Sequence, residues 1–158
     1  MVGLRRCCCN SMEQNQQWNE NLKLIALFQV LELSLKFYIG ANYLYISEKV
    51  GKEIAFKYSF IDLHNASLER LLTIFAKFND NSEFQKRLNK LKESRDLVAH
   101  RSMILSSESM PKNLKKFTVG YEENPIDYVE VNKELVECQI ILRAENLRLA
   151  TLLVSIGA

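Results

Sequence analysis

Arg95, Asp96 and His100 are the residues whose types and spacing point most clearly to chemistry. An arginine keeps its charge at any working pH and offers a planar fork of donors that suits phosphate oxygens. A histidine has an unperturbed pKa of about 6.5 and can take or give a proton near neutrality. Together they suffice for cleavage of RNA without a metal. The imidazole would act as general base toward a ribose 2′-hydroxyl or as acid toward the leaving oxygen, and the guanidinium would stabilise the charge of the phosphorane-like transition state. Asp96 lies four residues before His100 and could orient its ring.

These three residues close a helix predicted over 82–102, and Arg95 falls on its apolar stripe. That stripe consists of Phe84, Leu88, Leu91 and Val98. Five residues turn a helix by about 500°, which leaves Arg95 and His100 about 140° apart around the axis. The two side chains could converge at a groove edge, where the helix frays near Ala99, or across a two-fold axis between two copies. The structural alternative is a surface or ion-pair role, with Arg95 bridging to Glu32 of the first helix.

The region around this motif is locally basic. Residues 86–116 hold nine Lys or Arg and three acidic residues, a charge of +6, although the whole chain carries only +2. Such a segment could attract phosphate, and the candidate RNA-binding side chains are Lys90, Lys92 and Arg101. A solvated helix face would have the same composition.

The chain of 158 residues is expected to form one all-α domain over 16–158, a helical bundle with a small β-hairpin insertion. Its few glycines and prolines favour long helices. Four main helices are predicted, over 16–47, 60–78, 82–102 and 133–156, with Ser59 or Asp62 capping the second and Asn132 the fourth. The hairpin is predicted from two β-like runs before the last helix, Lys115–Tyr121 and Ile126–Val131.

The first helix is apolar almost all round, which predicts a buried central rod. Gln29, Glu32 and Lys36 interrupt its apolar run, so a soluble core helix is predicted rather than a membrane span. Glu32 and Lys36 are four residues apart in the favourable order for an ion pair, which would be structural or would support the site. His64 lies on the apolar stripe of the second helix and is expected in the core or at an interface. The first and last helices carry more apolar surface than one partner covers, which suggests a homodimer.

Residues 1–15 are expected to be disordered or non-native, with Met12 as a candidate natural start. Cys7, Cys8 and Cys9 are adjacent, a poor arrangement for a disulfide framework or a zinc site, so reduced thiols and a cytoplasmic location are expected. Membrane anchoring through these cysteines is a minor alternative. The two histidines lack a supporting carboxylate cluster, so neither a metal nor a cofactor is predicted.

Arg95 to His100, late in the third helix of a small helical bundle, resembles the motif of the HEPN family, the higher eukaryotes and prokaryotes nucleotide-binding domain. In that motif an arginine, usually followed by a polar residue, precedes a histidine after four to six positions. Here four residues intervene and the polar residue is Asp96. Glu32 resembles the acidic residue that many members carry on a long first helix, and the likeness in element order covers nearly all of 16–157.

The resemblance implies a homodimeric, metal-independent ribonuclease whose cleft is built from both copies of the motif. Arg95 and His100 would be catalytic, Asp96 supportive and Glu32 an orienting group. Such members serve as toxins or abortive-infection effectors, which implies an antitoxin protein as a further partner. Toxins neutralised by nucleotidyl transfer carry a tyrosine two residues past the histidine, where this chain has Ser102, so that control route is not expected. Other members have lost activity, and a non-catalytic dimeric module that binds nucleotide, RNA or protein is the rival hypothesis.

Overall fold

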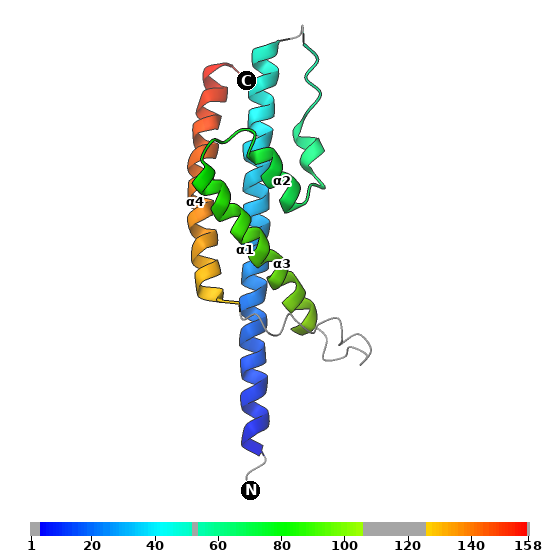
Figure 1. Ribbon diagram of the computed structural model, residues 1–158, viewed down its shortest axis with the longest axis vertical. Helices are drawn as coiled ribbons and strands as arrows, with labels where there is room; N and C mark the ends of the chain where they lie inside the picture. Colours follow the sequence, from blue (N-terminus) through cyan, green and yellow to red (C-terminus); the bar gives the residue numbers. More distant parts are fainter. Residues whose placement is uncertain (1–3, 52–53, 106–125, 158) are drawn as a thin grey trace.

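Helices are the only regular secondary structure in the described part of the chain (Figure 1). The computed structural model describes residues 4–51, 54–105 and 126–157, with side chains omitted at 4–15, 101 and 103–105. Its helices are α1 (Leu4–Val50), α2 (Leu68–Phe75), α3 (Ser82–Leu105) and α4 (Tyr128–Ser155), with a short 3₁₀ helix, η1 (Phe60–Leu63), before α2. The prediction of an all-α fold with four main helices is confirmed.

Helix α1 is the element that all the others contact, since α2, α3, α4 and η1 each pack against it. Leu24, Leu31 and Leu35 lie on its inner side and are buried, whereas Leu33 and Phe37 are about half exposed, at 48% and 53%. The expectation of a rod buried on most sides was therefore wrong. The apolar residues encircle α1, but only one side of it reaches the core.

Helices α1 and α4 lie side by side and run parallel (Figure 1). The Gln139 side-chain amide donates to the carbonyl of Leu27 (2.9 Å), and the Asn146 amide donates to the carbonyl of Ser34 (3.2 Å). The two contacts lie seven residues apart on each helix and follow the same order, so the two helices run in the same direction in a fixed register.

Helix α3 crosses this pair and is attached to α4 by an arginine fork. Arg87 donates from Nε to Glu134 Oε1 (2.5 Å) and from Nη2 to Glu134 Oε2 (3.0 Å) and Glu137 Oε2 (2.7 Å). Hydrogen bonding to Arg87 lowers the pKa of the Glu134 carboxyl. The fork and the buried Phe84, Leu88 and Leu91 hold α3 on the bundle.

The predicted second helix is interrupted. Ser59 and Asp62 form a capping box for η1, the chain turns at His64, and Ser67 then caps α2 by accepting from the Arg70 amide. Two local caps compete with one continuous helix over 60–78, and each satisfies N–H groups that would otherwise lack a partner. His64 is exposed, so it does not lie in the core of the single chain; its predicted alternative place at an interface stays a prediction.

Gly40 lets η1 approach α1 closely. A Cβ at this position would lie 2.6 Å from a ring carbon of Phe60, and the Phe60 ring stacks on Phe37 at 5.6 Å between centroids. The glycine thus serves close packing here.

The start of α4 also differs from prediction. Asp127 is its N-cap and accepts from the amides of Val129 and Glu130, so Asn132 lies inside the helix. The predicted strand Ile126–Val131 is wrong because most of it forms the first turn of α4, where a strong aspartate cap outweighs local β-propensity. Its predicted partner, Lys115–Tyr121, lies outside the described residues.

At the other end of the chain, α1 begins at Leu4. Residues 4–15, expected to be disordered or non-native, therefore continue the first helix. A separate origin for residues 1–11 stays a prediction.

Replacing Arg87 by methionine should lower the free energy of unfolding by about 1 kcal/mol at pH 7, because a bidentate pair in a partly shielded site is lost. Because the folded-state pKa of Glu134 is lowered, its contribution is present above the unfolded pKa and disappears as the pH falls through the folded value. Urea unfolding at pH 7 and at pH 3 should show the difference between wild type and Arg87→Met shrinking in acid. A difference independent of pH would contradict the ion pair.

Candidate nucleic-acid site on the third helix

Arg95 lies on α3 against the outer edge of α1. Its Nε is 3.9 Å from Glu32 Oε1, and its Nη1 donates to Asp96 Oδ1 at 3.3 Å. The Arg95 side chain is 45% exposed. The bridge to Glu32 that the structural alternative predicts is thus present, but it is long and open to solvent. Asp96 is engaged with Arg95, although its proposed role was to orient His100.

His100 is exposed and lies on the same unbroken helix. Since α3 continues to Leu105, no fraying near Ala99 brings the imidazole round toward Arg95. On a regular helix a separation of five residues places two side chains about 140° apart around the axis. Helix geometry alone therefore does not bring Arg95 and His100 of one copy to the same phosphate.

Several cations of the predicted basic segment are paired with acids from other helices. Lys92 Nζ lies 3.3 Å from Glu69 of α2, and Arg87 is held by α4. Lys90 is exposed. The side chain of Arg101 lies outside the described residues, as do Lys112, Lys115 and Lys116. In the described part of the segment, acids from other helices therefore partly neutralise the positive charge.

Lys36 does not form the predicted pair with Glu32. Its Nζ donates to the backbone carbonyl of His64 at 2.9 Å, where it stabilises the turn between η1 and α2. Glu32 is consequently left to face Arg95. The spacing along one helix predicted that Glu32 and Lys36 could meet. It contained no information about the His64 carbonyl, which comes from a distant loop.

Cys138 is buried and free, with burial raising the pKa of its thiol to about 12. The neutral thiol is therefore not a nucleophile near neutrality. Within the described ranges, no three histidine, cysteine or acidic side chains gather as metal ligands do.

A cavity of about 830 Å³ that the sequence analysis missed lies between α1, α2 and residues 56–63. Tyr43 lines it and packs against Phe56, Tyr58 and Phe78, with ring centroids 5.6–5.8 Å apart. Burial raises the pKa of Tyr43. Helical periodicity did not predict this cluster, because aromatic side chains brought together from distant segments leave little local signal.

Comparison with known protein families, curated proteins and solved structures finds no match to this chain. The likeness to the HEPN family therefore rests on the residues themselves. Residues Gln16–Val50 of α1 are long and apolar enough to cross a membrane by length and composition, a property that core helices of soluble proteins share.

The long Arg95–Glu32 contact should contribute little to stability. A double-mutant cycle with Arg95→Ala and Glu32→Ala, followed by urea unfolding, should return a coupling energy of about 0.2–1 kcal/mol, since exposed pairs are weak. A coupling energy above roughly 2 kcal/mol would show Arg95 committed to a structural ion pair and would remove it as a phosphate ligand.

Proposed function

We propose that this chain is a metal-independent endoribonuclease of HEPN type, acting as a homodimer in the cytoplasm. The observation that carries the proposal is the solvent-open Arg95 guanidinium on α3, placed beside Glu32 of the long first helix. Glu32 is the first-helix acid to which the resemblance assigns an orienting role. The four-helix all-α architecture, with the motif late in α3, supports it.

In the proposed reaction His100 removes the proton of a ribose 2′-hydroxyl, and the 2′-oxygen attacks the adjacent phosphorus. The bond to the 5′-oxygen breaks, and that oxygen takes a proton from a second imidazole acting as acid. The products are a 2′,3′-cyclic phosphate and a 5′-hydroxyl. Arg95 stabilises the negative charge on the non-bridging oxygens, while Lys90, Lys92 and Arg101 contribute contacts to the RNA backbone.

A second copy meeting the first along α3 is required by this proposal. It would place His100 of one copy across from Arg95 of the other and overcome the divergence on a single helix. It would also supply the two imidazoles that the acid and base steps need. A role as a toxin or phage-defence effector, with an antitoxin as partner, belongs to the same proposal.

Purified protein should cleave RNA in the presence of a chelator and leave 2′,3′-cyclic phosphate ends. Arg95→Ala and His100→Ala should each lower the rate by at least about 100-fold, because a transition-state charge or a proton-transfer group is lost. The chain offers matched controls in its other histidine, His64, and in the exposed Arg148 of α4, whose alanine variants should cleave like wild type. Undiminished cleavage in both motif variants would refute the assignment.

A non-catalytic RNA- or nucleotide-binding module is the second candidate. It is favoured by the unbroken α3, which keeps Arg95 and His100 apart, and by the carboxylates around Arg95. Its signature is RNA binding that Arg95→Ala weakens, with the substrate intact at high protein concentration.

A further inference from the structure

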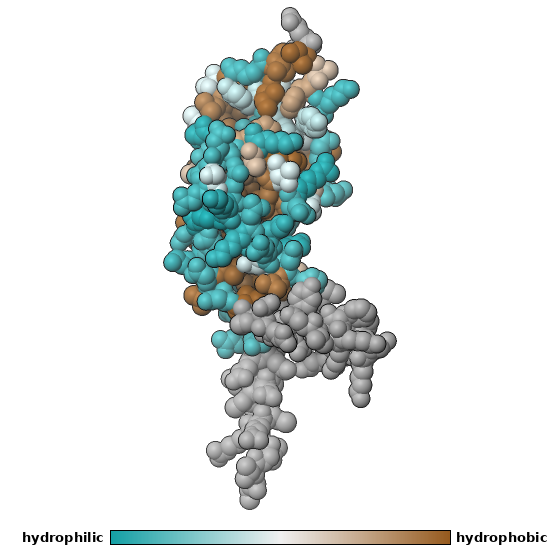
Figure 2. Space-filling model, in the orientation of Figure 1, coloured by the Kyte–Doolittle hydropathy of each residue, from teal (hydrophilic) through white to brown (hydrophobic). Residues whose placement is uncertain are grey.

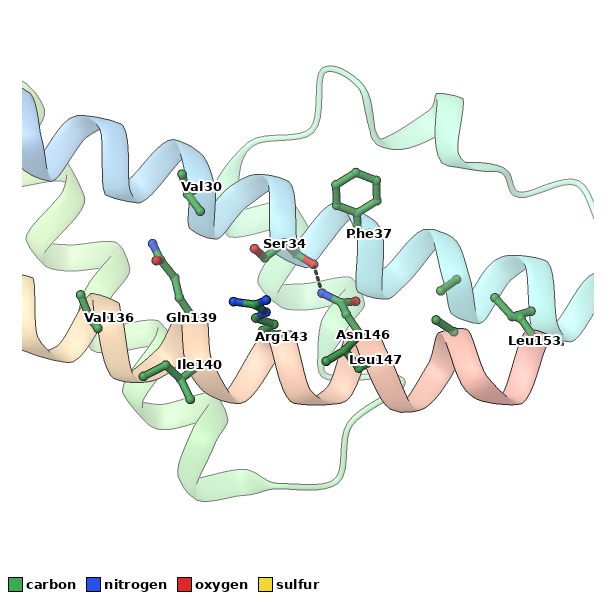
Figure 3. A pocket seen from close by; sticks show the side chains of 12 residues that line it. Val30, Ser34, Phe37, Val136, Gln139, Ile140, Arg143, Asn146, Leu147 and Leu153 are labelled. Atoms are coloured by element: carbon green, nitrogen blue, oxygen red, sulfur yellow. Dashed lines mark hydrogen bonds between the residues drawn. The ribbon is translucent and has the colours of Figure 1, made fainter. Parts of the chain in front are cut away.

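An apolar groove of about 620 Å³ runs between α1 and α4 (Figure 3). Val30, Phe37, Ile140 and Leu147 line it, and Arg143 is the one ionisable side chain along it. Ile140 and Leu147 are 63% and 61% exposed. The groove is thus an open apolar face rather than part of the core.

The groove faces away from α3. At about 100° per residue, its α1 positions lie roughly 140–200° around the helix from Glu32, which contacts α3. Its α4 positions Val136, Arg143 and Leu147 lie roughly 180–220° from Glu134, which binds Arg87 of α3. The face that carries α3 is mostly hydrophilic over its middle (Figure 2), whereas the groove is lined mainly by apolar side chains.

The outward stripe of α4 follows a seven-residue repeat. Its two sets of positions are Val129, Val136, Arg143 and Ala150, and Lys133, Ile140, Leu147 and Val154. These alternate at steps of four and three, the spacing of a helix that packs against another helix along its length. The inward face of α4 has its own row, Leu135, Leu142 and Leu149, all buried in the bundle. Helix α4 therefore carries two helix-packing faces, and among the described residues only the inward face packs against other helices.

Helix α1 contributes a matching stripe on the same side. Leu22, Leu33 and Leu44 recur every eleven residues and are each about half exposed. Val30 and Phe37 lie between them. The shared stripe of the two helices is about 33 Å long and, at about 10 Å per helix, about 20 Å wide. This footprint of roughly 700 Å² is close to the ~800 Å² that each partner buries in a stable interface.

We infer that the α1/α4 groove is a self-association surface, on which a second copy of this chain packs its own α1/α4 groove. Two parallel apolar helices that face the same side form a self-complementary layer, which a two-fold axis can pair with itself. A lipid surface fits less well, because Arg143 lies in the middle of the stripe and an ionised side chain is costly in hydrocarbon. In a protein interface its long stem can pack while the guanidinium reaches the rim. A polar residue in the middle of such a stripe restricts the register at a cost in affinity.

This pairing leaves α3 outermost in both copies, so it does not bring two Arg95–His100 motifs together. It is distinct from the contact along α3 that the proposed nuclease requires, and it stands without that function. With both contacts present, the assembly would be larger than a dimer.

Sedimentation of the full-length chain from 1 to 100 μM tests the inference. Wild type should form a dimer, or a larger assembly if α3 also pairs, and Ile140→Glu should lower that mass or raise the dissociation constant by at least about 30-fold. Because Ile140 is exposed in the single chain, the circular dichroism spectrum of the Ile140→Glu variant should match that of wild type. Ile61→Glu, at the 81% exposed isoleucine of η1, is the matched control and should sediment as wild type.

Arg143→Leu should tighten the association, because it removes the desolvation of a charge. Wild type that stays monomeric at 100 μM, an unchanged mass in Ile140→Glu, or weaker association in Arg143→Leu would each overturn the inference. A monomer that binds vesicles of anionic phospholipid through this face would overturn it too. Chelator-resistant RNA cleavage, measured on the same preparations, reports separately on the proposed function.

Discussion

The parallel register of α1 and α4 is the constraint on which the rest of the structure depends. Two side-chain amides on α4 donate to backbone carbonyls of α1 one heptad apart. Each such bond contributes only about 1 kcal/mol net, whereas each buried leucine between the helices contributes about 1.5–3 kcal/mol. The leucines therefore supply most of the stability, and the amides select which alignment of the leucines is adopted. A slip by one residue would leave both amides without acceptors.

This parallel pair of helices has two faces of different character. One face receives α3 through buried side chains and the Arg87 fork, and it presents polar, charged helix to solvent. The other is apolar, open and lined by residues of both long helices. Arg87 and Arg95 show how one helix uses two arginines differently. Arg87 is held by short bonds to two carboxylates, whereas Arg95 makes long, exposed contacts that a phosphate could replace.

The sequence predicted what depends on local signals. The apolar stripes of α1 and α4 identified both long helices, and the third helix was correctly predicted to begin at Ser82, where Asn81 Oδ1 accepts from the Phe84 amide. Excess apolar surface on the first and last helices was also visible, although its single-sided arrangement was not. Helical periodicity counts apolar positions but cannot say which of two apolar sides has a partner.

Some predictions failed because they depend on contacts between distant segments, and others because local caps were not recognised. The carbonyl of His64 takes Lys36 away from Glu32, and two acids of α4 take Arg87 out of the basic segment. The break between η1 and α2 and the early start of α4 come from caps at Ser67 and Asp127, which outweighed the periodic pattern that had been extended across them.

The division into a covered face and an open pairing face can be tested by thiol alkylation of two matched variants. Ala150→Cys places a thiol on the groove, and Ala76→Cys places one at the exposed end of α2. Rates should be measured at 1 μM and at 100 μM protein, with the mass of the labelled peptide as readout. The account predicts that Cys at position 150 is protected only at the higher concentration, whereas the thiol at position 76 reacts equally at both. Equal reactivity of the groove thiol at both concentrations would contradict it.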